Sequence, residues 1–142
     1  MNWLLWALLS AFFAGLTAVL AKVGVAGVNS DVATAIRTAV ILVFTWAIAL
    51  GAGREAIFTT LSRRTWLFLI LSGLATGLSW LCYFRALQAG EASQVAPVDK
   101  LSVVFAIALA ALFLHERLTW HHWAGGALIL GGAILIAIKP PA

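Results

Sequence analysis

The stretch that decides the fold runs from Ser93 to Leu118 and reads SQVAPVDKLSVVFAIALAALFLHERL. It is almost wholly apolar, yet a charged pair, Asp99 and Lys100, follows a proline near its beginning. Its end is abrupt and carries several charges. A soluble protein can bury such a helix in its core, so the composition of the rest of the chain decides between a core helix and a membrane helix.

The composition excludes an ordinary soluble domain. Of the 142 residues, 63% are hydrophobic and only 10% are charged, whereas a soluble domain carries about 25% charged residues. The net charge of +4 comes from dispersed Lys and Arg, without the basic face of a nucleic-acid-binding protein. We therefore expect an integral membrane protein with no nucleic-acid partner, and the length predicts a single domain over residues 1–142.

Five apolar segments are long enough to cross a bilayer as helices, which takes about 20 residues each. Strands are disfavoured because the apolar runs exceed the roughly 9–11 residues of a membrane strand and do not alternate with polar residues. We predict an all-α membrane protein with transmembrane helices at about residues 3–22, 32–50, 65–88, 94–114 and 120–138.

The ends of these helices carry recognisable signals. Asn29, Ser30 and Asp31 supply N-cap chemistry for the second helix, and the fifth helix is expected to end at Lys139, Pro140 and Pro141. Five spans place the two termini on opposite sides of the membrane.

The charges in the loops determine the orientation only weakly, and they favour a cytoplasmic amino terminus. On the amino-terminal side lie four cations and on the other side three: Arg54, Arg63, Arg64 and Arg117 against Lys22, Arg85 and Lys139.

Polar residues mark the faces through which membrane helices pack or enclose a cavity. Four of the five helices carry such residues, whereas the fifth offers only glycines and alanines. One interpretation is that the hydroxyls bond their own helix carbonyls and hold helices together. We favour a shared cavity among the first four helices, with the fifth at the periphery or at a subunit contact. The predicted substrate-binding residues are Trp6, Ser10, Thr17, Arg37, Thr38, Thr76, Trp80, Tyr83, Asp99, Lys100 and Ser102.

Charged residues inside a membrane usually face a cavity or a partner. For Arg37, a cavity role and an anchoring role are both open. Asp99 and Lys100 would point about 100° apart on a helix and would not pair face to face, so one of them is expected to face the interior. Pro97 either breaks the helix and frees backbone groups for a solute, or lies near a helix start that places Asp99 in the first turn, where a carboxylate suits the helix dipole.

The chain shows no sign of catalytic or metal chemistry. His115, His121 and His122 lie near one loop, but a metal needs converging ligands and no second cluster is present. No nucleophile–base arrangement, phosphate loop or metalloprotease motif occurs. We expect neither an enzyme nor a cofactor.

From Tyr83 to Thr119 the chain reads YFRALQAGEASQVAPVDKLSVVFAIALAALFLHERLT, and a glycine-rich helix, WAGGALILGGAILI, follows. This resembles the EamA domain of the drug/metabolite transporter superfamily, with its Y-F-x-A-L, its G-x-A-S turn and its fourth helix ending in L-G-E-R-L. An arginine early in the second helix, here Arg37, also fits. His115 departs from the pattern, because the domain usually has glycine there.

The resemblance implies a homodimer, because most EamA proteins contain two inverted domains and ten helices. One chain would then be half of a ten-helix assembly, with the two copies either antiparallel or parallel. We predict an alternating-access transporter of a small neutral or zwitterionic metabolite, an exporter in the cell (inner or plasma) membrane. The alternatives are a passive facilitator or pore and a non-transporting scaffold in a larger membrane complex.

Overall fold

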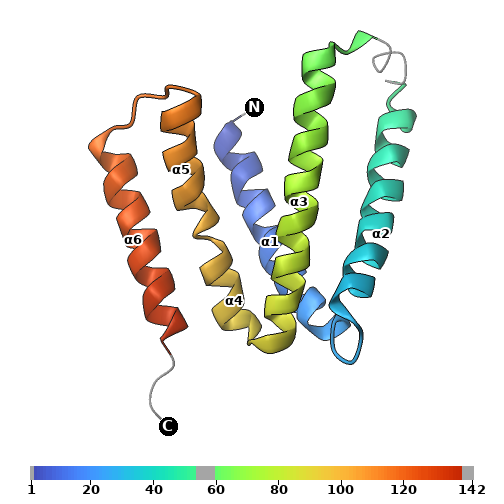
Figure 1. Ribbon diagram of the computed structural model, residues 1–142, viewed down its shortest axis with the longest axis horizontal. Coiled ribbons are helices and arrows are strands. Elements are labelled where there is room, and N and C mark those ends of the chain that lie inside the picture. The colour runs from blue at the N-terminus through green and yellow to red at the C-terminus, as the bar shows by residue number, and fades with distance from the viewer. Residues whose placement is uncertain (1, 54–59, 139–142) are drawn as a thin grey trace. The chain divides into compact units, whose positions relative to one another are not determined.

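The computed structural model describes residues 2–53 and 60–138. Arg54 and the expected helix stop at 139–141 lie outside the described residues. The chain forms the α-helices that Figure 1 labels, and the described residues contain no strand. The helices are α1 (Trp3–Gly24), α2 (Ser30–Gly51), α3 (Arg63–Ala89), α4 (Ala92–Asp99), α5 (Ser102–Phe113) and α6 (Trp120–Ala137).

Five helical segments are long and apolar enough to cross a membrane, and α4 and α5 together make the fourth, Ala92–Phe113. Leu, Ile, Val, Phe and Trp side chains are exposed along all five. Such a surface suits lipid rather than water. The prediction of an all-α membrane protein with five spans is confirmed. Among the described residues, the buried apolar side chains are Ala18, Val25, Phe84, Leu87 and Ala133.

The first, second, third and fifth predicted helices agree with α1, α2, α3 and α6 to within two residues at each end. The N-cap of α2 is Asn29, whose Oδ1 accepts from the backbone N–H groups of Asp31 and Val32 at 2.8 and 3.4 Å. The capping chemistry expected before the second helix is therefore confirmed. The helix begins at Ser30 rather than at residue 32 because Asn29 alone acts as the cap.

The fourth predicted helix, residues 94–114, is not continuous. The chain leaves α4 after Asp99 and enters α5 at Ser102. Between them, the N–H of Lys100 donates to the carbonyl of Pro97 at 3.1 Å and that of Leu101 to the carbonyl of Val98 at 3.0 Å. These are bonds across three residues, as in a tight 3₁₀ turn. The span is therefore broken, as one of the two interpretations of Pro97 expected, but the break lies three residues past the proline.

The other interpretation, a helix that starts near Pro97, was wrong. The helix does not start near Pro97, because α4 begins at Ala92 and contains the proline. Asp99 is the last residue of α4 and not part of a first turn. A proline removes its own N–H and crowds the carbonyl four residues earlier, which here belongs to Ser93. Its direct effect therefore lies upstream, whereas the break lies downstream at Lys100.

The chain divides into two compact parts, residues 1–22 with 89–142 and residues 23–88. In the first part, α6 packs against α4 and α5, with Gly126 and Ala133 buried. The Lys22 ammonium at the end of α1 donates to the carbonyl of Gly90, just before α4, at 2.7 Å. In the second part, α2 and α3 run antiparallel as a helical hairpin (Figure 1). That residues 1–142 form a single domain stays a prediction.

Candidate functional site

Long polar side chains set the register of the α2–α3 hairpin near the start of α2 and the end of α3. The Gln88 amide donates to the carbonyl of Val28. One turn deeper, Nη2 of Arg85 donates to both carboxylate oxygens of Asp31, at 3.1 and 3.2 Å. The contact residues lie three positions apart on both segments, from Val28 to Asp31 and from Gln88 to Arg85, as expected for antiparallel helices.

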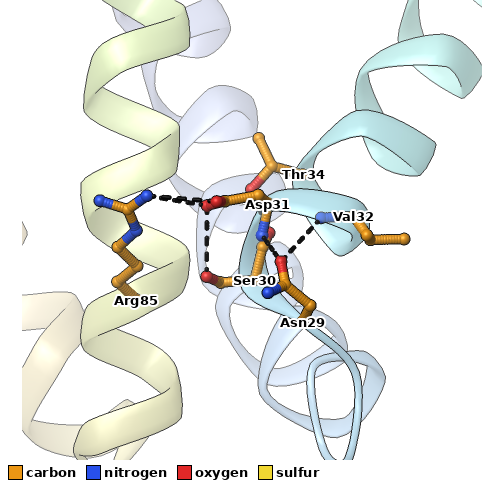
Figure 2. A network of polar contacts seen from close by, with 6 residues as sticks. All are labelled: Asn29, Ser30, Asp31, Val32, Thr34 and Arg85. Carbon is orange, nitrogen blue, oxygen red and sulfur yellow. Dashed lines mark hydrogen bonds and ion pairs between the residues drawn. The ribbon is translucent and has the colours of Figure 1, made fainter.

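Figure 2 shows how the Asp31 carboxylate is held at the start of α2. Arg85 reaches it from α3, and the hydroxyl of Ser30 donates to its Oδ1 at 3.4 Å. Asn29 caps the same helix end from below, through the backbone N–H of Asp31. The carboxylate also lies in the first turn of α2, where the helix dipole favours an anion. Asp31 is therefore anchored by its own helix and available to hold α3.

Arg37 lies further along α2, and its guanidinium stacks on aromatic rings of α3. Its Cζ lies 4.3 Å from the ring centroid of Trp80 and 5.5 Å from that of Phe84. Both distances are within the range of a cation–π interaction. The side chain is half-buried. Arg37 and Trp80 were predicted separately as lining residues, and the structure brings them together.

The threonine hydroxyls of this hairpin bond within their own helices. Thr34 donates to the carbonyl of Ser30, Thr38 to that of Thr34, and Thr76 to that of Ser72, each at 2.8 Å. This is the local bonding that competed with the cavity interpretation. The hydroxyl oxygens keep lone pairs that can accept from a ligand. Thr38 and Thr76 can therefore serve a ligand as acceptors, while their own protons are committed.

At the α4–α5 break, Nζ of Lys100 lies 3.5 Å from Oδ2 of Asp99, and the two form an ion pair. The expectation that they would not pair was wrong. It assumed the 100° offset of a continuous helix, and Lys100 lies just past the end of α4. Ser102 is the first residue of α5 and is exposed.

Lys100 also lines an open groove of about 420 Å³ between α4 and α6. The rest of its lining is apolar: Ala96, Pro97, Leu128, Ile129, Gly132 and Ala133. Asp99, the residue before Lys100, is half-buried and is not part of this lining. Of the two charged residues, the one at this groove is therefore the lysine.

The remaining predicted residues lie on α1 and α3. Trp6 and Ser10 are exposed and Thr17 is half-buried. Tyr83 is half-buried, and its ring meets that of Phe84 edge to face at 6.3 Å between centroids. That the residues of α1 and those of the hairpin line one cavity stays a prediction.

Sequence reasoning missed the partnership of Asp31 with Arg85 and the role of Phe84. A signal for the first was present, because opposite charges stood at the facing ends of two consecutive helices. A signal for the second was the spacing of Trp80 and Phe84, which places two rings one turn apart on one helix face.

His115 lies in the loop before α6, and His121 and His122 lie in the first turn of that helix. His122 caps that helix, since its Nδ1 accepts from the backbone N–H of Thr119 at 3.1 Å. In residues 2–53 and 60–138, no three His, Cys, Asp or Glu side chains come together as metal ligands.

Comparisons with known proteins identify the family of this chain. The profile of the EamA-like transporter family matches residues 1–138. The chain is 56% identical over 137 residues to a protein of Sinorhizobium sp named "Uncharacterized transporter in cobO 3′region", covering 96% of this chain and 97% of that protein.

Two further relatives carry more specific names. An Enterobacter sp. protein named as a probable 4-amino-4-deoxy-L-arabinose-phosphoundecaprenol flippase subunit ArnE is 33% identical over 68% of this chain and 94% of its own length. A probable terminal-alkyne amino-acid exporter of Streptantibioticus cattleyicolor is 41% identical over 45% of this chain and 22% of its own length. No solved structure matches the chain. With a family profile that covers nearly its whole length and relatives named as transporters, this chain is an integral membrane protein that belongs to the EamA-like transporter family.

Proposed function

We propose that the protein exports a small neutral or zwitterionic metabolite across the cell (inner or plasma) membrane by alternating access. The observation that carries this proposal is the break in the fourth span. Lys100 and Leu101 are the ninth and tenth of the 22 residues Ala92–Phe113, so the break lies near the middle of the span. In many transporters, discontinuous helices near the membrane midplane supply backbone groups to substrates and coupling ions.

The two opposite charges at the break favour a neutral or zwitterionic substrate. Asp99 and Lys100 neutralise each other at 3.5 Å. A zwitterion carries one charge of each sign, so it can bind beside this pair without adding a net charge to the membrane interior. A neutral solute can bind without opening the pair. A bare ion would leave one of the two charges unpaired inside the membrane, which is costly.

The working unit in this proposal is a homodimer of two five-helix chains. Support comes from the family, in which most proteins contain two such domains, and from the even balance of loop charges. If the two copies are inverted, a reporter fused to the carboxyl terminus will be found on both sides of the membrane. One orientation only would exclude the inverted dimer and leave a parallel one.

Transport is tested with purified protein in liposomes loaded with a mixture of unlabelled metabolites, by mass spectrometry of what leaves and enters. An alternating-access transporter coupled to an ion concentrates its substrate when a pH or sodium gradient is imposed. A passive facilitator only equilibrates the substrate across the membrane. Uphill movement therefore distinguishes the two functions.

The site is tested with Asp99→Asn and Arg37→Ala in the same liposomes. Both variants are expected to fold and to lose transport. Glu116→Gln, in the loop after α5, serves as a charge-removal control and should retain it. If Asp99→Asn and Arg37→Ala both fold and transport at the wild-type rate, the assignment of the site is wrong.

A second candidate function is a subunit of a larger membrane complex, and the relatives named as flippase subunits favour it. In that case the purified chain alone would transport nothing. Its activity would appear only with a co-purifying membrane partner, and Asp99→Asn would leave that activity intact.

A further inference from the structure

Arg37 is an arginine placed well inside a membrane-spanning helix. It is the eighth of the 22 residues of α2, and seven residues at 1.5 Å each put it about 10 Å from the helix start. A cation at that depth is costly unless it has a partner or faces a water-filled space. The contacts of the Arg37 guanidinium show which kind of partner it can take.

The guanidinium does not reach back toward the membrane edge. Trp80 lies nine residues before the end of α3 and Phe84 five residues before it, which is about 13 and 8 Å along the axis. The guanidinium lies closer to the deeper ring, at 4.3 Å, than to the shallower one, at 5.5 Å. An anchoring arginine that snorkels would extend the other way.

The nearest carboxylate along the hairpin is already engaged. Asp31 pairs with Arg85 and accepts from the Ser30 hydroxyl. In the part of the chain that the structure describes, the ion pairs are those of Asp31 with Arg85 and of Asp99 with Lys100, and neither includes Arg37.

Stacking on Trp80 uses the face of the guanidinium and leaves its edges. The N–H groups lie in the guanidinium plane, in a fork that matches the two oxygens of a carboxylate. A stacked arginine is also held in position before a ligand arrives, so less side-chain entropy is lost on binding. The guanidinium of Arg37 is thus held against the rings of Trp80 and Phe84 in a position where its N–H groups can bind an oxyanion.

We propose that Arg37, held on Trp80, binds the carboxylate of the transported solute. This inference rests on the proposed transport function and narrows the substrate class from neutral or zwitterionic solutes to those that carry a carboxylate. A lipid phosphate offers the same oxyanion chemistry. The depth of the guanidinium favours the solute, and the experiment below separates the two.

The test uses benzoate and benzamide, which match in size and shape and differ in the carboxylate. Binding of each to the purified protein is measured by equilibrium dialysis in a phosphate-free maltoside detergent. Wild-type protein should bind benzoate more tightly than benzamide. Arg37→Gln should weaken benzoate binding by about tenfold to a hundredfold, the value of losing a charge-assisted bond, and should leave benzamide unchanged.

Arg85→Gln is the matched control, because it removes an arginine of the same hairpin that is paired with Asp31, and it should keep the preference for benzoate. Arg37→Lys keeps the charge without the planar fork and should bind benzoate with intermediate affinity. Equal binding of benzoate and benzamide by the wild type would overturn the proposal. This measurement needs no variant, so the proposal can be tested even if Arg37→Gln does not fold. A benzoate preference that survives in Arg37→Gln would overturn it as well.

The lipid source is examined by adding phosphatidylglycerol and measuring the retained lipid by native mass spectrometry. Lipid retention that Arg37→Gln abolishes, without a benzoate preference in the wild type, assigns the guanidinium to a headgroup and overturns the proposal. Because binding is measured without transport, the two proposals fail separately. Benzoate binding that depends on Arg37 can persist in a protein that transports nothing uphill.

Discussion

The helices within the α2–α3 hairpin and the helices within the α4–α6 region are held together by different kinds of contact. In the hairpin, long side chains connect the helices: Arg85 with Asp31, and Arg37 with the rings of Trp80 and Phe84. In the α4–α6 region, small residues of α6 are buried against α4 and α5. Lipid provides no hydrophobic force between helices, so packing of small residues and polar bonds are the two available means.

The contacts that a ligand could replace lie in the hairpin. Long polar side chains can exchange partners without moving a helix axis, so a ligand can replace one of their contacts. Small residues such as Gly126 and Ala133 have no long polar side chain that could exchange one partner for another. The hairpin is therefore suited to bind a ligand, and α6 is suited to support the broken fourth span.

The largest effect is expected from Ala133→Leu, which enlarges a side chain that is 4% exposed on α6. Overpacking a nearly covered side chain costs about 1–3 kcal/mol, even where it borders a groove as Ala133 does, so the free energy of unfolding in detergent should fall by that amount. Ala127→Leu is the control, because Ala127 is exposed on the same helix, and its stability should stay near that of the wild type. If both variants are equally stable, α6 is not held by close packing.

The next effect concerns the hairpin and the cap of α2. Asn29→Ala removes the acceptor of two backbone N–H groups, and loss of such a cap costs about 1 kcal/mol. Asn29→Asp keeps an acceptor and should retain nearly full stability. Thermal unfolding followed by circular dichroism distinguishes the two variants. Equal losses in both would mean that the amide oxygen does not cap the helix.

A stabilising change is expected after α5, where His115 has a φ of 55°. A left-handed conformation costs a non-glycine residue about 1–2 kcal/mol, and glycine loses about 0.5–1 kcal/mol in chain entropy. His115→Gly should therefore raise the free energy of unfolding by about 0.5–1 kcal/mol. Glu116→Gly, at the neighbouring position, should lower it, and a gain in both would remove this explanation.

The smallest effect is the coupling between Asp31 and Arg85, whose side chains are 52% and 63% exposed. An exposed ion pair contributes about 0.5 kcal/mol. A double-mutant cycle with Asp31→Asn and Arg85→Gln should give that coupling energy, and 1 M salt should reduce it because its Debye length is about 3 Å. Additive effects of the two substitutions would show that the pair does not hold the hairpin together.

The candidate site could be predicted in part. Arg37, Trp80, Asp99 and Lys100 were recognised as polar or aromatic residues in apolar spans, because an isolated charge in such a run is conspicuous. Which of them meet could not be predicted, since the stacking of Arg37 on Trp80 depends on the rotation of two helices about their axes. The pairing of Asp99 with Lys100 depends on where the fourth span breaks, and Pro97 acts on the turn before it rather than on the break.

At His115 the sequence showed an unusual residue, but its structural reason could not be predicted. Its place in the family pattern, where glycine is usual, was visible in the sequence and carried no structural meaning by itself. The backbone at this position turns into the left-handed region to end α5, and the N–H of Glu116 then donates to the carbonyl of Ala110 at 3.3 Å. Glycine adopts such a φ without steric cost.

By itself, the sequence determined the helical class, the five membrane spans, most helix ends and the cap at Asn29. These follow from the length of apolar runs and from short-range capping, which act within a few residues along the chain. The sequence also indicated a break near Pro97, which the structure places at Lys100 through bonds across three residues. The tertiary structure alone decided the contacts of Arg37 and Asp31. These depend on helix register and rotation, which arise only when side chains far apart in the sequence meet.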